Sequence, residues 1–283
     1  MKKLRRKQII IGKLKGSIEL MSCQAKTARH AVQTILVALR MVCVSVGTVA
    51  GFGKVKDGRE KAPENNMELK ILYDNEALKG FRKGFGFSCW VEDKNILFDT
   101  GGDSATLMFN IQKFMINPKN IEKIVLSHDH GDHTGGIQII NYCGEVDVFV
   151  LKSFSKQFKK WLAGHSNVRL HDVDKAEEIC RDVYTTGELG WLVKEQSLIV
   201  KTCNGSTVIT GCAHPGLENI LRFASNFGDI YGVIGGFHSF SRLEALKGMQ
   251  LIVPCHCTIR KREIFKLYPK TCKKCSAGCT ILI

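Results

Sequence analysis

Short apolar blocks alternate with polar or glycine-containing turns along the chain from residue 67 onward. Such blocks predict strands, here Leu69–Tyr73, Phe87–Glu92, Asn95–Phe98, Ile121–Leu126, Val146–Leu151, Leu198–Lys201, Thr207–Thr210, Gly228–Ile234, Gln250–Val253 and Ala277–Ile283. Helical patterns lie between them, at Ser104–Ile116, Ile137–Tyr142, Ser153–Leu162, Leu217–Phe227 and Arg242–Leu246. Strands that meet helices repeatedly indicate an α/β layered fold.

Residues 1–66 follow a different pattern, with a basic start and a mostly apolar stretch over residues 31–50. Three interpretations remain open: an extension outside the core fold, a membrane-associated anchor and a secretory signal. Arg40 at the centre of the apolar stretch disfavours a membrane span, and the basic start is too long for a typical signal peptide. We therefore expect residues 1–66 to be a basic and apolar extension and residues 67–283 to be the folded catalytic domain.

The formal net charge of +14 is unevenly distributed. Residues 1–66 contain 14 Lys/Arg and 4 Asp/Glu, a net charge of +10, whereas residues 67–283 contain 27 and 23, a net charge of +4. Clustered positive charge is the usual sign of a nucleic-acid or anionic-membrane partner. We therefore expect no nucleic-acid partner for residues 67–283, and membrane contact only through residues 1–66. The sequence leaves the oligomeric state open.

Twelve cysteines are scattered along the chain instead of forming the dense framework of a small secreted domain. This distribution favours a reducing, cytoplasmic location. Cys272, Cys275 and Cys279 have spacings that suit a zinc knuckle or an iron–sulfur cluster, to which Cys255 or Cys257 could add a fourth thiolate. The preferred interpretation is that these cysteines are reduced and carry no metal, and that Cys212, Cys255 and Cys257 pack around the site described next.

The strongest chemical signal follows the predicted strand Ile121–Leu126, in the loop Ser-His-Asp-His-Gly-Asp-His-Thr-Gly-Gly. Imidazole and carboxylate groups suit zinc, iron and similar divalent ions. His128 and His130 can point the same way at positions i and i+2, while Asp132 and His133 project toward a second position. This loop therefore predicts half of the ligands for each of two metal sites.

Three further histidines follow predicted strands, each after a loop with glycine or proline: His214, His238 and His256. Loops at strand ends carry function in α/β folds. We expect His214 and His256 to be metal ligands. His238 is expected at the site either as a ligand or as a donor facing the substrate. Glu195 and Gln196 are open to two interpretations, a polar turn or a role in the site.

With these residues in place, the sequence resembles the metallo-β-lactamase superfamily. The shared motif is HxHxDH, filled here by His128, His130, Asp132 and His133. The motifs GFS, EQSL, GCAHPG, GGFH and PCHCT are similar to one subgroup, the 7,8-dihydropterin-6-methyl-4-(β-D-ribofuranosyl)aminobenzene-5′-phosphate synthase-like metallo-hydrolases. The resemblance covers roughly residues 68–283 and implies an αββα sandwich of two mixed sheets flanked by helices.

The resemblance also implies the arrangement of the ligands. One metal would be held by His128, His130 and His214, and a second by Asp132, His133 and His256. Asp99, in an early aspartate-containing turn, would orient a ligand histidine from behind. Relatives often bridge the two metals with an aspartate near the position that His238 occupies here, so a carboxylate bridge is in doubt.

The implied function is a metal-dependent hydrolase, or a related transferase or synthase, that uses a metal-activated hydroxide on a small molecule. Phosphorylated and pterin-like molecules are the candidate substrates, and the cofactors would be two divalent ions, zinc first, with iron or manganese as alternatives. Asp132 would ligate a metal and orient the hydroxide, and His238 could donate a hydrogen bond to an oxyanion. The alternatives are a nucleic-acid-processing phosphodiesterase of the same fold and a non-catalytic metal-binding protein.

Overall fold

The computed structural model describes residues 67–283. The three interpretations of residues 1–66, including the anchor at residues 31–50, lie outside the described residues and stay predictions. So does the boundary between residues 66 and 67. Within residues 67–283, none of the helices has the length and apolar character that crossing a bilayer requires.

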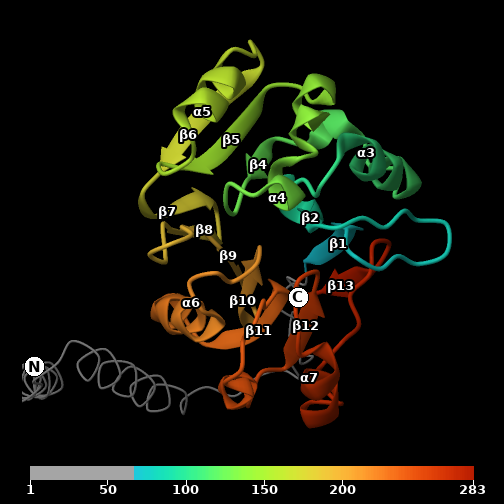
Figure 1. Ribbon diagram of the computed structural model, residues 1–283, viewed down its shortest axis with the longest axis vertical. Helices are drawn as coiled ribbons and strands as arrows, with labels where there is room; N and C mark the ends of the chain where they lie inside the picture. Colours follow the sequence, from blue (N-terminus) through green and yellow to red (C-terminus); the bar gives the residue numbers. More distant parts are fainter. Residues whose placement is uncertain (1–66) are drawn as a thin grey trace, which may run out of the picture. The chain divides into compact units, whose positions relative to one another are not determined.

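The first sheet has seven strands in the order β13-β1-β2-β3-β4-β5-β6 (Figure 1). The strands from β3 to β6 run parallel, and the other pairs are antiparallel. Their bounds are β1 Glu68–Tyr73, β2 Ser88–Val91, β3 Ile96–Phe98, β4 Lys123–Val125, β5 Val146–Leu151, β6 Val168–Val173 and β13 Thr280–Leu282.

The second sheet has six strands in the order β12-β11-β10-β9-β8-β7. Strands β10, β11 and β12 are parallel, and the remaining pairs are antiparallel. Their bounds are β7 Lys175–Cys180, β8 Val183–Gly187, β9 Leu198–Thr202, β10 Gly205–Thr210, β11 Ile230–Gly236 and β12 Leu251–Cys255.

Helices cover the outer faces, with α3 and α5 on the first sheet and α6 and α7 on the second (Figure 1). The α-helices are α3 Ser104–Lys113, α4 Gly131–Thr134, α5 Lys156–Ala163, α6 Leu217–Ala224 and α7 Lys261–Leu267. Short 3-10 helices are η1 Glu92–Lys94, η2 Pro118–Asn120, η3 Ile137–Tyr142, η4 Ser225–Phe227 and η5 Leu243–Leu246.

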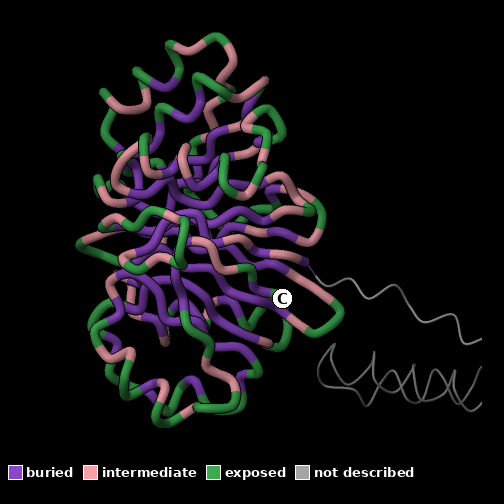
Figure 2. The backbone as a smooth tube through the Cα atoms, turned by 90° about the vertical axis from the view of Figure 1, so that its right-hand side faces the viewer, coloured by how far each residue is buried: buried purple, intermediate pink, exposed green. Residues whose placement is uncertain are grey.

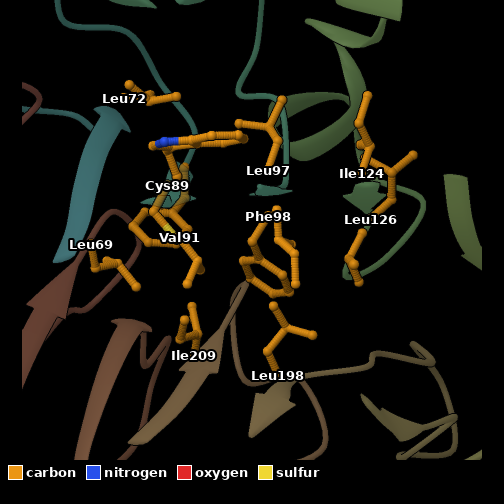
Figure 3. Packing of buried hydrophobic residues seen from close by; sticks show 14 of the residues in the cluster. Leu69, Leu72, Cys89, Val91, Leu97, Phe98, Ile124, Leu126, Leu198 and Ile209 are labelled. Atoms are coloured by element: carbon orange, nitrogen blue, oxygen red, sulfur yellow. The ribbon is translucent and has the colours of Figure 1, made fainter. Parts of the chain in front are cut away.

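Successive side chains of a strand point to opposite faces of the sheet. The apolar residues of the second sheet therefore contribute to two separate hydrophobic cores. Leu198 and Ile209 point toward Val91 and Phe98 of the first sheet (Figure 3). Their chain neighbours, such as Ile199, belong to a separate cluster that packs under α6 and α7. Buried residues fill the middle layers, while exposed residues lie mostly in the outer turns and helices (Figure 2).

The inter-sheet packing at Ile209 gives a simple test. Ile209 is fully buried, whereas Ile259 is 72% exposed. We expect Ile209→Val to lower the free energy of unfolding by about 1 kcal/mol, because the removed methylene leaves a cavity. Ile259→Val, the same substitution at the surface, is expected to change it by less than about 0.5 kcal/mol. Urea denaturation of both variants measures the difference, and equal effects would contradict the assignment of Ile209 to the core.

The predicted fold, two mixed sheets flanked by helices, is confirmed. Several details differ. Helix α5 starts later than predicted because the hydroxyl of Ser155 accepts a hydrogen bond from Phe158 N and begins the helix there. The segments predicted as helices at Ile137–Tyr142 and Arg242–Leu246 form 3-10 turns. The final strand is shorter than Ala277–Ile283.

Candidate metal centre

The predicted ligand residues come from loops at the carboxyl ends of parallel strands. The histidine-rich loop follows β4, and Asp99 follows the neighbouring strand β3. In the second sheet, His214, His238 and His256 follow β10, β11 and β12 in turn. The two parallel sets end at the same edge of the sandwich, which is the usual place for a site in an α/β fold.

Three imidazoles form the first group. The rings of His128 and His130 have centroids 4.6 Å apart, and both lie close to His214, at 4.8 and 5.0 Å. His128 Nε2 is 3.0 Å from His130 Nδ1. The structure thus brings together the three residues predicted for the first metal.

A second group lies beside the first. Asp132 Oδ2 is 2.9 Å from His256 Nε2 and 3.5 Å from His133 Nε2. These are the three residues predicted for the second metal. Cys212 completes the group, because its Sγ atom is 3.1 Å from His133 Nε2. The four donor atoms all lie within 4.8 Å of one another.

Cys212 also belongs to a donor group with His128 and His214, again with all atoms within 4.8 Å. The sequence predicts only a packing role for this cysteine. Its position two residues before His214 in Gly-Cys-Ala-His was the available signal. His130 is not a member of the group that contains Cys212.

Hydrogen bonds to Nδ1, on the side of each ring away from the centre, orient His128 and His133. Asp99 is fully buried, and its Oδ2 is 2.7 Å from His133 Nδ1. It also accepts hydrogen bonds from the backbone N–H and the hydroxyl of Ser127. The hydroxyl of Ser127, 2.8 Å from His128 Nδ1, is left to accept from that ring. In the neutral form of each ring, this arrangement favours a proton on Nδ1 and leaves Nε2 as the nitrogen available to a metal.

His256 is held by two further residues, which were not predicted from the sequence. Asn75 Oδ1 is 2.9 Å from His256 Nδ1, and Asp74 Oδ1 accepts the backbone N–H of His256 at 2.6 Å. Both residues follow β1 in the sequence Tyr-Asp-Asn-Glu. His256 has a backbone φ of 39°, a strained conformation for a non-glycine residue. Asp74 holds that backbone in place together with Asn75, whose Nδ2 donates to His256 O at 3.2 Å.

Glu195 fixes the loop that carries Cys212 and His214. One carboxylate oxygen accepts the backbone N–H groups of Gly211, Cys212 and Ala213 at 2.9–3.0 Å, and the other accepts that of His214 at 2.8 Å. The Glu195 side chain is buried, so water cannot replace these bonds. Gln196 lies outside the donor groups and ties strand backbones together, donating to Leu126 O at 2.8 Å.

The protonation states suit metal ligation. Burial and then the neighbouring imidazoles lower the pKa of His128 far below its ordinary value, and they lower the pKa of His214 to about 4. Burial also lowers the pKa of His256, although Asp132 opposes this shift. For Asp132, burial would raise the pKa, but the hydrogen bond from His256 and the charge of His133 lower it to about 2. Neutral imidazoles beside an ionised carboxylate are the forms that bind metal.

His133 differs from the other histidines. Burial would lower its pKa, but the adjacent carboxylate of Asp99 raises it above the ordinary value. For Glu195, burial raises the pKa, and the four N–H donors counteract part of that shift.

A buried nitrogen atom without a partner also indicates that these residues suit a divalent metal. His214 Nε2 is buried and has no hydrogen-bond partner. A buried polar atom without a partner is costly, and this one points to the site where Cys212 and His128 also present donors. The mixture of imidazole, carboxylate and thiol donors is typical of zinc and iron sites.

His238 is placed differently from the other histidines. It is exposed, with a backbone φ of 45°, and its ring centroid is 5.0 Å from that of His214. Within residues 67–283 it belongs to none of the donor groups. It lies instead on the rim of a cavity of about 310 Å³ that Ser239 and Ser241 also line. This position favours contact with a substrate over metal ligation.

The three C-terminal cysteines do not lie together in one group of donor atoms. Cys275 lies with Cys255 and Asp74 in a buried group of donor atoms, whereas Cys272 and Cys279 belong to no such group within residues 67–283. The ten cysteines of this part of the chain are all free of disulfides.

Comparison with known sequences gives two findings. A sequence model of the metallo-beta-lactamase superfamily matches residues 84–193, which contain the histidine-rich loop. A protein of Methanocaldococcus jannaschii named 7,8-dihydropterin-6-methyl-4-(beta-D-ribofuranosyl)-aminobenzene-5'-phosphate synthase is 31% identical over 229 residues, 60% of this chain and 77% of that protein.

Solved structures agree with the sequence findings. Tm1679, described as a metal-dependent hydrolase of the beta-lactamase superfamily, is 28% identical, with a TM-score of 0.64 over 77% of this chain and 99% of that one. The metallo-beta-lactamase fold protein YhfI from Bacillus subtilis has a TM-score of 0.59 over 77% of this chain and 100% of that one. At 12% identity, the latter likeness is one of fold alone.

Proposed function

The chain belongs to the metallo-β-lactamase superfamily, and from this premise we propose that it is a metal-dependent hydrolase, or a related transferase or synthase, acting on a small molecule. One observation carries the proposal. Two groups of donor atoms, from loops far apart in the sequence, meet at one edge of the sandwich with their supporting hydrogen bonds already made. Such preorganisation is what a metal-dependent active site needs.

Two divalent ions, zinc in the first instance, would be held by the two groups of ligand residues predicted from the sequence, with Cys212 between them. When bound, the ions would supply acidification of water and polarisation of a substrate oxygen. Asp132 is ionised at neutral pH, and its side chain is 21% exposed. It can therefore accept a hydrogen bond from the attacking water and orient it. His238, on the cavity rim, would donate to the oxygen that gains charge.

A cavity beside the metal centre and the name of one relative support a proposal for the substrate class. The cavity beside His214 and His238 has a volume of about 310 Å³, which lies within the range of about 300–1,000 Å³ for small-molecule sites. Hydroxyl groups are among the groups that line it. The M. jannaschii relative is named for a phosphorylated pterin product. We propose a phosphorylated or pterin-like substrate on these grounds.

An activity screen tests the proposed reaction. The purified full-length chain, stripped of metal, is assayed on phosphodiester, lactone and thioester panels with and without Zn²⁺, Fe²⁺ or Mn²⁺. We expect metal-dependent hydrolysis of at least one panel member. Binding of metal without hydrolysis of any member would reject the hydrolase in favour of a synthase-type reaction. Hydrolysis confined to nucleic-acid phosphodiesters would favour the phosphodiesterase alternative.

Metal content gives a second test. We expect the full-length chain to bind two zinc ions and His128→Ala to lose at least one, because His128 is a member of the first group and its Nε2 is 3.0 Å from His130 Nδ1. His165→Ala is the matched control, since His165 lies outside the donor groups of the described residues. Elemental analysis after dialysis measures both variants. Fewer than one ion per chain, with His128→Ala no different, would exclude a metalloenzyme.

A further inference from the structure

The Sγ atom of Cys212 is common to both donor groups of the metal centre. It lies within 4.8 Å of the donors of His128 and His214 on one side and of Asp132, His133 and His256 on the other. Cys212 itself is only 3% exposed. Among residues 67–283, no other residue belongs to both groups.

The backbone holds this sulfur in place. Glu195 accepts the N–H groups of Cys212 and of its neighbours, and Ala213 has a φ of 58°, which turns the chain sharply between Cys212 and His214. Gly211 packs so closely on the histidine-rich loop that a Cβ atom there would lie 2.2 Å from the hydroxyl of Ser127. Cys212 therefore cannot move away from the histidines without breaking the loop.

The surroundings of Cys212 are not those of a packing residue. A free cysteine in a protein core behaves as a small hydrophobic side chain, as Cys89 does in the apolar cluster between the sheets. The sulfur of Cys212 contacts His133 Nε2 at 3.1 Å and Cys257 Sγ at 3.2 Å. Cys257 Sγ also lies 3.9 Å from Cys212 O, and within residues 67–283 Cys257 is in none of the donor groups.

We propose that the thiolate of Cys212 is a ligand shared by the two metal ions. This inference rests on the proposed function, because it presumes that the centre binds two ions. The thiol proton passes to solvent as the metal–sulfur bond forms. A sulfur donor favours Zn²⁺, Fe²⁺ and Co²⁺ over Mg²⁺ and Mn²⁺. The centre should therefore discriminate between these two sets of ions.

Titration of the metal-free, full-length chain with Co²⁺ tests the proposal by absorption. Cobalt bound by imidazole and carboxylate gives visible ligand-field bands, whereas a cobalt–thiolate bond adds an intense charge-transfer band in the near ultraviolet. We expect this band to grow through the second equivalent of Co²⁺. In Cys212→Ser we expect it to disappear while the visible bands persist.

Cys257→Ala is the matched control, because it removes the adjacent sulfur and leaves Cys212 in place. We expect the charge-transfer band to remain in this variant. Cys212→Asp provides a second check, since a carboxylate should still allow two ions to bind without the band. Circular dichroism establishes that each variant is folded.

The possible outcomes separate the two levels of inference. Visible bands without a charge-transfer band in the unmodified chain, or a band that survives Cys212→Ser, would overturn the role of Cys212 and leave the metal centre intact. A band that saturates at one equivalent would assign Cys212 to one ion and overturn the sharing. A chain that binds no Co²⁺ would overturn both the inference and the proposed function.

Discussion

Glu195→Ala is expected to lower the free energy of unfolding of the metal-free chain by about 4 kcal/mol or more, and to abolish tight metal binding. The carboxylate accepts four backbone N–H groups in a buried loop. Each buried donor left without a partner costs about 1–3 kcal/mol. Since a domain is typically stable by about 5–15 kcal/mol, this loss is a large share of the total.

Urea denaturation and zinc titration measure the two consequences separately. Glu195→Gln should retain part of the stability, because its amide oxygen can still accept N–H groups while the negative charge is lost. Glu177→Ala is the surface control, since Glu177 is exposed on β7; it should shift the free energy of unfolding by less than about 0.5 kcal/mol. If Glu195→Ala were no more destabilising than Glu177→Ala, the carboxylate would not be what holds the loop.

Asp132→Asn is expected to reduce the turnover of whichever panel substrate is cleaved by about 10²–10⁴-fold, the usual range for loss of a group that handles a proton. The amide keeps the shape of the side chain but removes the charge that faces His256 and His133. It therefore loses both a proposed metal ligand and the acceptor for the attacking water. Steady-state kinetics at saturating metal, together with elemental analysis, measure these two losses.

The same loop provides the control. Asp129 lies three residues earlier, is exposed, and accepts a hydrogen bond from Ser155 N at 3.3 Å. Because it belongs to no donor group within residues 67–283, Asp129→Asn should keep metal binding and activity within a few-fold of the unmodified chain. Comparable losses in the two variants would mean that the loop as a whole, and not the carboxylate of Asp132, is required.

The parts of the fold that could be predicted are those in which burial follows a simple period. Strand β10 alternates between two cores, so its apolar and β-branched residues reveal it in the sequence. Strand β7 (Lys175–Cys180) was missed because it lies at the edge of its sheet with most side chains exposed. Its pairing with β8 is made by the backbone, which leaves no apolar pattern to detect.

In the site, too, some features could be predicted from a local sequence pattern and others could not. Histidines and aspartates in a short loop are recognisable from residue type and spacing alone. The contact of Cys212 with both donor groups depends on the left-handed backbone of Ala213, and the function of Glu195 depends on a loop that follows it by 16–19 positions. The contacts of Cys212 with the histidine-rich loop arise only when the two sheets have packed together. Those of Glu195 arise only when β9 and β10 have paired.

The pairing of β1 with β13 has a consequence for protein synthesis. Glu68 is paired with Leu282, so the first described strand waits for a partner that the ribosome makes after every other described element. Until then, β1 has an unpaired edge, and pairing over such a separation is slow. Every proposed ligand of the metal centre is therefore synthesised before the last strand of the sheet beneath the histidine-rich loop, and that sheet is completed only after the chain has been made.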